Sequence, residues 1–317
     1  MTSGNSPVGV LIMAYGTPSS PDQIEAFYTD VRRGRAPNLE QLSQLMGRYE
    51  AIGGTSPLAA RTAEQVAGIQ AELDLATPGC FSCILANKHS EPKIENAVAQ
   101  LASKGVSRLV GLVLAPHYSK GSVGEYLDRA SVAAESHAIS VTFVEHWHDN
   151  PVLIELLAER TGDAVASLGP LGERARENGE LLLLVTAHSL PVRVVAGGDP
   201  YADQLRRTAE LVAARSGLAR FEIGWQSAGR TPEPWLGPDI LEKLRSLPGE
   251  NISAVVVCAA GFTSDHLEVL YDLDIEARRV AEEVNVAFAR TRSLNAEPRM
   301  CAALADLVIA ASRGAEL

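Results

Sequence analysis

The sequence predicts an α/β protein made of two similar halves. Eight strand-length apolar segments, rich in Val, Ile and Leu, alternate with segments of helical periodicity along the 317 residues. These strands show little polar alternation, as expected for parallel strands that helices cover on both faces. Because the eight strands divide four and four, we expect two Rossmann-like domains, each a four-stranded parallel sheet flanked by helices. The predicted domains are residues 1–150 and 151–317, with the last helix packing back on the first domain.

After the first strand and a long insertion, helices and strands are expected to alternate. Several helical patterns begin with Pro or Asp, a usual signal at helix N-termini. The expected strands are 8–14, 80–86, 108–115, 139–145, 181–187, 221–225, 254–260 and 284–289. The expected helices are 57–74, 91–104, 123–135, 151–167, 200–215, 236–246, 265–283 and 298–312.

Two segments interrupt this alternation. The insertion at about 16–56 follows the first strand and carries helical patterns at 22–31 and 39–52. Insertions after the carboxyl end of a strand often build the ligand site of an α/β fold, so this one is a candidate pocket wall. The stretch 168–179, which contains several glycines, is expected to be a polar insertion before the fifth strand.

Composition excludes several classes of protein. The net charge of −11 disfavours nucleic acid as a partner, because a non-specific binder must neutralise phosphates. No apolar run approaches the ~20 residues that span a bilayer, and the N-terminus lacks a secretory signal. Four cysteines do not make a disulfide scaffold in a chain of this length. We therefore expect a cytoplasmic protein with no transmembrane segment.

His188 is the most conspicuous polar residue in the sequence. It ends a very apolar strand, where a neutral imidazole can accept a proton or bind a borderline metal ion. The alternative is a strand-end histidine whose ring is satisfied by a backbone carbonyl. Polar residues also follow the first, second, third, sixth and seventh predicted strands, so we expect one crevice at the carboxyl ends of the strands.

Three carboxylates lie at four-residue intervals in the helix predicted after the seventh strand. Glu268, Asp272 and Glu276 share one helix face, although like charges at this spacing destabilise a helix by roughly 0.2–0.5 kcal/mol per pair. A divalent cation would explain such a ladder. The alternative is structural, with Asp265 and Glu268 as a capping box and Asp274 paired to Arg278.

Arginines cluster in the insertion of this acidic chain. Arg32, Arg33 and Arg35 are near neighbours, and Arg48 follows. Guanidinium groups bind carboxylates or phosphates, which favours an anionic small molecule; the alternative is a set of cations that stabilises a helix C-terminus. Cys80 and Cys83 form a C-x-x-C pair at the start of a predicted strand, where a redox role is not expected.

Seven sequence motifs together resemble the ferrochelatases, in the right order and over nearly the whole chain. The similarity is strongest to the monomeric coproporphyrin ferrochelatases of Gram-positive bacteria and actinobacteria. The motifs are MAYGTP at 13–18, RYEAIGGTSP at 48–57, LAPHY at 114–118, TAHSLP at 186–191, GWQS at 224–227, PWLGP at 234–238 and DHLEVLYD at 265–272.

The resemblance implies a chelatase-like fold with an active-site cleft between the two domains, and insertion of Fe(II) into a porphyrin with release of two protons. It implies that His188 and Glu268 bind the metal and accept protons, and that Asp272 and Glu276 continue an acidic line. Tyr15 matches a residue that faces the metal from the other side. Residues matching positions that hold propionates or the ring edge are Arg32, Arg48, Tyr49, Ser56 and Tyr126.

The resemblance also bears on cofactors and partners. Fe(II) is then a substrate rather than a bound cofactor, and we expect a monomer that passes its product to a downstream enzyme of haem synthesis. Many actinobacterial relatives carry a [2Fe–2S] cluster, but this chain lacks the necessary set of cysteines, so no cluster is expected. Coproporphyrin III is the expected substrate and protoporphyrin IX the alternative. A cobalt chelatase, or a tetrapyrrole- or metal-binding protein without turnover, remains a further alternative.

Overall fold

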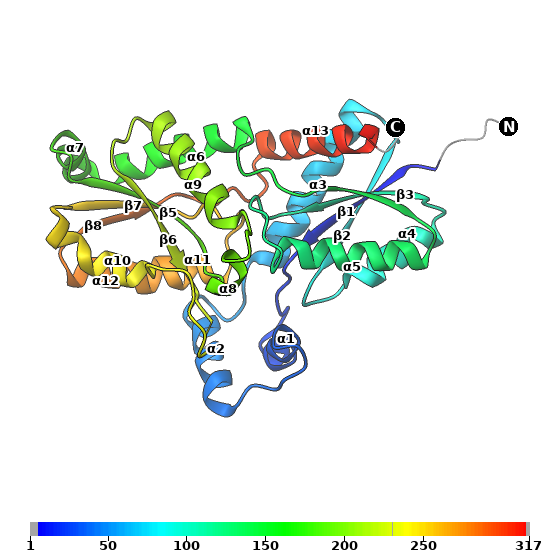
Figure 1. Ribbon diagram of the computed structural model, residues 1–317, viewed down its shortest axis with the longest axis horizontal. Helices are drawn as coiled ribbons and strands as arrows, with labels where there is room; N and C mark the ends of the chain where they lie inside the picture. The colour runs from blue at the N-terminus through cyan, green and yellow to red at the C-terminus, as the bar shows by residue number, and fades with distance from the viewer. Residues whose placement is uncertain (1–5, 230, 315–317) are drawn as a thin grey trace. The chain divides into compact units, whose positions relative to one another are not determined.

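The computed structural model describes residues 6–229 and 231–314, which divide into two compact units (Figure 1). Unit 1 contains the described parts of 1–115, 122–146 and 295–317. Unit 2 contains 116–121 and 147–294, apart from residue 230. The chain therefore passes between the units more than once, and its last helix belongs to unit 1. The outer ends of the predicted domains, residues 1 and 317, lie outside the described residues.

Each unit contains one four-stranded parallel sheet. In unit 1 the order is β2-β1-β3-β4, and in unit 2 it is β6-β5-β7-β8, so the two sheets have the same topology. The predicted α/β fold with four parallel strands in each half is confirmed. The strands are β1 (Val8–Ala14), β2 (Phe81–Asn87), β3 (Arg108–Val113), β4 (Ser140–Val144), β5 (Leu181–His188), β6 (Phe221–Gln226), β7 (Ala254–Cys258) and β8 (Ala287–Arg290).

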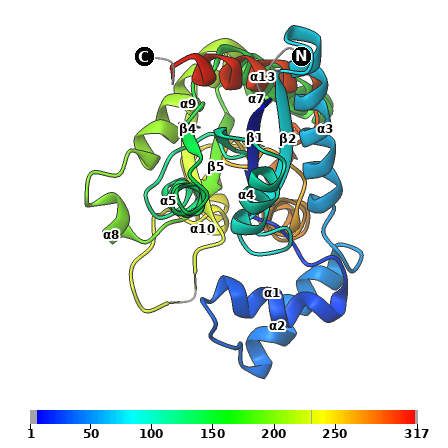
Figure 2. The same ribbon diagram turned by 90° about the vertical axis from the view of Figure 1, so that its right-hand side faces the viewer.

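Helices and an insertion surround the sheet of unit 1. The insertion after β1 forms a short helical turn and two helices, which lie beyond the end of the sheet in both views (Figures 1 and 2). Asn38 begins the second of these helices with a capping box. Its side chain accepts a hydrogen bond from the Gln41 backbone N–H, and the Gln41 side chain accepts one from the Asn38 backbone N–H. The helices are η1 (Pro21–Gln23), α1 (Ile24–Val31), α2 (Leu39–Ala51), α3 (Leu58–Ala76), α4 (Ile94–Ser103), α5 (Val123–Ser136) and α13 (Pro298–Gly314).

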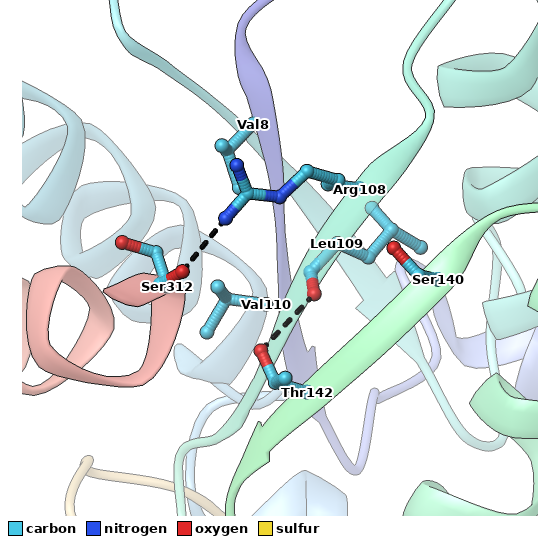
Figure 3. Close-up of a pocket in the computed structure, with 7 residues that line it drawn as sticks. All are labelled: Val8, Arg108, Leu109, Val110, Ser140, Thr142 and Ser312. Carbon is cyan, nitrogen blue, oxygen red and sulfur yellow. Dashed lines mark hydrogen bonds between the residues drawn. The ribbon is translucent and has the colours of Figure 1, made fainter. Parts of the chain in front are cut away.

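The C-terminal helix α13 is held against the sheet of unit 1. Arg108 Nη2 at the start of β3 donates to the Ser312 carbonyl at 2.7 Å, and α13 packs beside α3 (Figure 3). Gly68 of α3 allows this packing, since a Cβ there would lie 2.7 Å from Cys301 Sγ. The hollow beneath Arg108 measures only about 10 Å³, room for about one water molecule.

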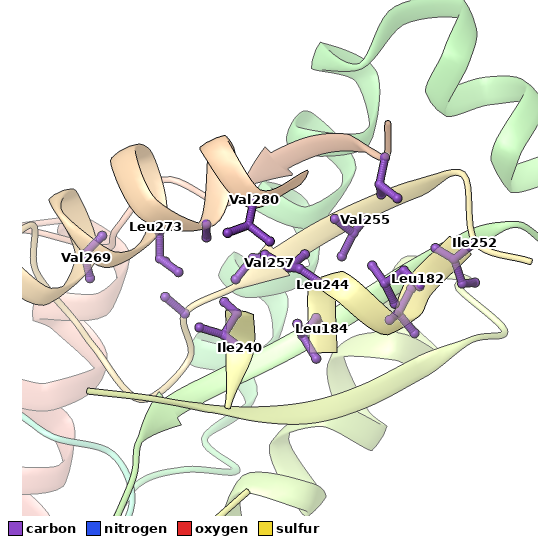
Figure 4. Packing of buried hydrophobic residues seen from close by; sticks show 14 residues of the cluster. Leu182, Leu184, Ile240, Leu244, Ile252, Val255, Val257, Val269, Leu273 and Val280 are labelled. Carbon is purple, nitrogen blue, oxygen red and sulfur yellow. The ribbon is translucent and has the colours of Figure 1, made fainter. Parts of the chain in front are cut away.

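The core of unit 2 positions the segment that carries the acidic ladder. Val269, Leu273, Ala277 and Val280 are fully buried and pack toward β5, β7 and α10 (Figure 4). This apolar spacing leaves Glu268 and Glu276 on the more exposed side. The helices of unit 2 are α6 (Pro151–Ser167), α7 (Gly169–Glu177), α8 (Val192–Val195), α9 (Tyr201–Ser216), α10 (Ile240–Ser246), η2 (Leu247–Glu250), α11 (Leu267–Leu270), η3 (Asp272–Ala277) and α12 (Arg278–Glu283).

Two local predictions were wrong. The polar stretch 168–179, expected as an insertion before the fifth strand, is mostly the helix α7, with Pro170 in a first-turn position that needs no amide donor. The single helix expected at 265–283 is divided into α11, the π-helical turn η3 and α12. Asp265 does not form a capping box, since its carboxylate accepts from Ser293 Oγ and the N-cap residue of α11 is His266.

Candidate active site

His188 and Glu268 meet in unit 2 at the point where the strand order reverses. His188 is the last residue of β5, and Glu268 lies on α11, which follows the neighbouring strand β7. Ligands of open α/β sheets bind at such switch points, outside the carboxyl ends of the strands. The His188 Nδ1 and Glu268 Oε2 atoms are 3.0 Å apart, within hydrogen-bonding distance.

The pair is polarised and still accessible. Burial would raise the pKa of Glu268, but the charge and hydrogen bond of His188 lower it to about 2. Burial would lower the pKa of His188, but the charges of Glu268 and Asp272 raise it above its usual value. Glu268 is therefore a carboxylate that accepts the Nδ1 proton, and in the neutral imidazole this leaves Nε2 as the nitrogen with a lone pair. The side chains are 37% and 30% exposed, so a metal ion can reach them.

The other two carboxylates of the ladder lie along the π-helical turn η3. Asp272 is buried and accepts a short hydrogen bond from Ser227 Oγ, whereas Glu276 is half-buried. The amide of Glu276 donates to the Tyr271 carbonyl, an i to i−5 bond that defines a π-turn. Asp274 binds Arg290 through both carboxylate oxygens, at 2.6 and 2.7 Å, and not Arg278 as the structural alternative expected.

Three residues around the pair were not assigned a role from the sequence. The Tyr201 hydroxyl donates to the His188 carbonyl at 3.0 Å, and Gln226 Nε2 donates to the Glu268 carbonyl at 3.3 Å. Ser227 has a φ of +57°, which is uncommon for a residue with a side chain and often marks a functional site. The sequence signals for Gln226 and Ser227 are their place at the end of β6, next to the end of β5, and the GWQS motif at 224–227.

Tyr15 lies in unit 1, directly after β1 and at the corresponding switch point of that sheet. Its side chain is 43% exposed, and its ring centroid is 4.6 Å from that of His89. Phe27 of α1 contacts both rings edge-on. The insertion thus supports Tyr15 from one side.

The remaining predicted residues lie in or beside the insertion of unit 1. Arg32 and Arg48 are half-buried, and the Arg32 guanidinium carbon lies 5.4 Å from the centre of the Tyr28 ring. Tyr49, Ser56 and Tyr126 are buried, and Ser56 Oγ accepts from the Leu58 amide at the start of α3.

Arg33 and Lys88 share one carboxylate in unit 1. Both donate to Glu125, at 2.7 Å each, and the buried Lys88 ammonium also lies 5.0 Å from the centre of the Tyr126 ring. Burial lowers the pKa of Lys88, an effect that Glu125 opposes. Arg33 is therefore already paired with a carboxylate, whereas the sequence left open whether the arginine cluster binds an anion or stabilises a helix C-terminus.

Three of the four cysteines are poor candidates for redox chemistry. Burial raises the pKa of the thiols of Cys83 to about 12 and of Cys258 and Cys301 to about 11. Thiolates are the reactive and metal-binding form, so these thiols are inert at neutral pH. Cys80 is exposed at the entrance to β2.

Two solved structures of similar fold are sirohydrochlorin chelatases. Sirohydrochlorin chelatase SirB from Bacillus subtilis subspecies spizizenii, in complex with cobalt, aligns with 98% of this chain and 97% of its own at a TM-score of 0.56 and 10% identity. SirB from Bacillus subtilis with Fe³⁺ aligns at a TM-score of 0.53 and 12% identity, over 98% of this chain and 97% of its own. At such low identity the likeness concerns the fold alone.

Sequence comparison places the chain more narrowly. The ferrochelatase family model matches residues 7–312. The coproporphyrin III ferrochelatase of Anoxybacillus flavithermus is 45% identical over 95% of both chains. That of Bacillus subtilis strain 168 is 42% identical over 95% of this chain and 97% of its own. The chain belongs to the ferrochelatase family and is a metal chelatase, a lyase whose metal substrate is iron. No helix within 6–229 or 231–314 is long and apolar enough to cross a bilayer.

Proposed function

We propose that this chain inserts Fe(II) into coproporphyrin III and forms coproheme for haem synthesis. The choice of porphyrin is supported by relatives that are 42–45% identical over 95% of the chain and carry the name coproporphyrin III ferrochelatase. The chemistry is supported by one observation above all, the 3.0 Å pair of His188 and Glu268 at the switch point of unit 2. A weakly held metal ion needs few protein ligands, and this pair offers one imidazole nitrogen and one carboxylate.

The mechanism follows from what the four porphyrin nitrogens require. Two of them carry protons, and both protons must leave as Fe(II) binds, so the reaction releases two protons and changes no oxidation state. In this mechanism His188 Nε2 accepts a proton or binds the metal. Glu268 orients the imidazole through Nδ1 and stabilises its charged form. Asp272 and Glu276 are to pass protons or metal along the same segment. The softer imidazole nitrogen suits Fe(II) better than oxygen ligands alone would.

We assign the porphyrin-binding role to unit 1. In this proposal Tyr15 faces the metal, and the guanidinium groups of Arg32 and Arg48 bind propionates through charge-assisted hydrogen bonds. Tyr49, Ser56 and Tyr126 are to contact the ring edge. We further propose that the enzyme acts as a cytoplasmic monomer, without an iron–sulfur cluster, and hands its product to a downstream enzyme of haem synthesis.

The test is an anaerobic absorbance assay with Fe(II), run side by side on coproporphyrin III and protoporphyrin IX. Faster metallation of coproporphyrin III is the expected result. Faster metallation of protoporphyrin IX would support the proposed ferrochelatase activity but contradict coproporphyrin III as the substrate. Tight binding of both porphyrins without metallation would instead indicate a binding protein.

A further inference from the structure

Asp30, near the end of α1, holds two side chains from the loop after β2. Its Oδ2 atom lies 2.7 Å from His89 Nδ1, and its Oδ1 atom accepts from Lys93 Nζ at 2.8 Å. All three residues belong to unit 1. One carboxylate thus ties the insertion to the end of the sheet that also carries Tyr15.

This contact selects one tautomer of His89. Burial would raise the pKa of Asp30, but the hydrogen bonds from Lys93 and His89 bring it below its usual value, so the group is ionised at neutral pH. An ionised carboxylate only accepts hydrogen bonds, so Nδ1 of His89 carries the proton. Burial also lowers the pKa of His89, which keeps the ring neutral and Nε2 unprotonated.

The fixed imidazole in turn supports Tyr15. The ring centroids of His89 and Tyr15 are 4.6 Å apart, with the planes tilted by 60°. Phe27 of α1 packs edge-on against both rings. The side chain of His89 is only 12% exposed, whereas Tyr15 is 43% exposed. Contact with His89 therefore limits the directions in which the tyrosine ring can turn.

A cavity beside the rings of His89 and Phe27 would let the imidazole move if Asp30 did not hold it. It measures about 470 Å³ and is lined by Phe27, Asp30, His89 and Lys93 among others. Its wall also includes Thr17, whose buried Oγ1 has no hydrogen-bond partner among the described residues. Because His89 lines this space, an imidazole released from Asp30 has room to turn into it, and Tyr15 would then lose its support.

We propose that Asp30 is a positioning residue for Tyr15 and acts through His89, a role that rests on the function proposed above for Tyr15. In this role Asp30 acts through His89 and not by direct contact with porphyrin or metal. Its removal is expected to change the tautomer and orientation of His89, and through them the rate of metal insertion, with little effect on the affinity for porphyrin.

The first readout is structural and needs no activity. In ¹⁵N-histidine-labelled wild-type protein, His89 is expected to show the Nδ1-protonated form and proton contacts with the Tyr15 ring. In Asp30→Ala, the two tautomers are expected to interconvert and those contacts to weaken. Asp30→Asn retains an acceptor oxygen and is expected to keep the wild-type tautomer.

The second readout is kinetic. For Asp30→Ala we expect kcat of metallation to fall about tenfold, below the ~10²-fold that a 1 Å misplacement can cost, with the porphyrin dissociation constant within about twofold of wild type. Asp30→Asn should recover most of the loss. The matched control is Glu155→Ala in unit 2, whose side chain has the same 42% exposure and accepts from Arg215 at 2.9 Å; its kcat should not change.

Two outcomes would overturn the proposal. One is an unchanged His89 tautomer in Asp30→Ala, whatever happens to the rate, because Asp30 would then not act through His89. The other is a changed tautomer with unchanged kcat, because the position of His89 would then not matter to the reaction. Failure of the proposed function is a separate result, in which the wild-type protein itself metallates no porphyrin.

Discussion

His188 Nδ1 lies 3.0 Å from Glu268 Oε2, although 80 residues separate the two in the chain. The contact forms because β5 and β7 are neighbouring parallel strands whose carboxyl ends meet at one edge of the sheet. It makes the carboxylate a partner of the imidazole rather than an independent charge. Each member of the pair therefore determines the protonation state of the other.

Replacing His188 by Ala should abolish metal insertion and leave porphyrin binding intact. The change removes the proposed base and metal ligand, whose side chain is partly exposed, so we expect kcat to fall by about 10² or more. Metallation is measured by absorbance and porphyrin binding by fluorescence quenching. His137→Ala, at an exposed position after α5, is the control. Turnover retained in His188→Ala would contradict the role.

Glu268→Gln should show that the pair works as a unit. The amide keeps the shape of the side chain but cannot hold charge beside the imidazole, so kcat should again fall by about 10². The double variant with His188→Ala should be little worse than either single variant, since residues acting together are not additive. Fully additive losses would argue for independent roles. Glu250→Gln, which alters a carboxylate 34% exposed and bound to Lys243, is the control.

Gly261→Ala should disturb the strand end that carries His188. A Cβ at this position would lie 2.4 Å from Ala187 Cβ and 2.7 Å from its Cα, and the Gly261 amide already donates to the Thr186 carbonyl at 3.0 Å. Because backbone must move, we expect a loss of about 1–3 kcal/mol in the free energy of unfolding, together with a lower kcat. Urea titration measures the former. Gly249→Ala, where a Cβ meets no atom within 4 Å, should change neither quantity.

The stability of unit 2 should fall with acid through His117. This residue is 2% exposed, and burial with the neighbouring His148 lowers its pKa from 6.5 to about 3. Between these two values the unfolded chain binds a proton that the folded protein does not, so stability decreases as pH falls and is fully present above the unfolded pKa of 6.5. The slope is up to about 1.4 kcal/mol per pH unit.

His117→Asn tests this dependence. The variant loses the 2.9 Å contact between His117 Nε2 and Thr208 Oγ1, so we expect lower stability at pH 8 and a shallower decline toward pH 5 in urea unfolding. An identical decline in variant and wild type would show that His117 is not responsible. His137→Asn provides the exposed control.

Most of the secondary structure was predictable because buried parallel strands and amphipathic helices leave strong periodic signals. The strand ends differ from prediction by a few residues, most at β8, which begins at Ala287 rather than at 284. The interruption of the acidic segment by η3 was not predictable, because its pattern satisfies an α-helix equally well. The partner of Asp274 was not predictable either. It is Arg290 on β8, sixteen residues away in sequence, and not Arg278 one turn along the helix.

The sequence by itself determined the α/β class, the two repeated sheets and the ferrochelatase family, because hydrophobic periodicity and contiguous motifs are local properties of the chain. It also identified His188 and Glu268 as residues worth attention. Only the tertiary structure decided that these two are hydrogen-bonded, that Arg33 is already paired with Glu125, and that Asp30 holds His89 against Tyr15. Such contacts join residues far apart in sequence, and their geometry depends on strand order and packing that no local pattern encodes.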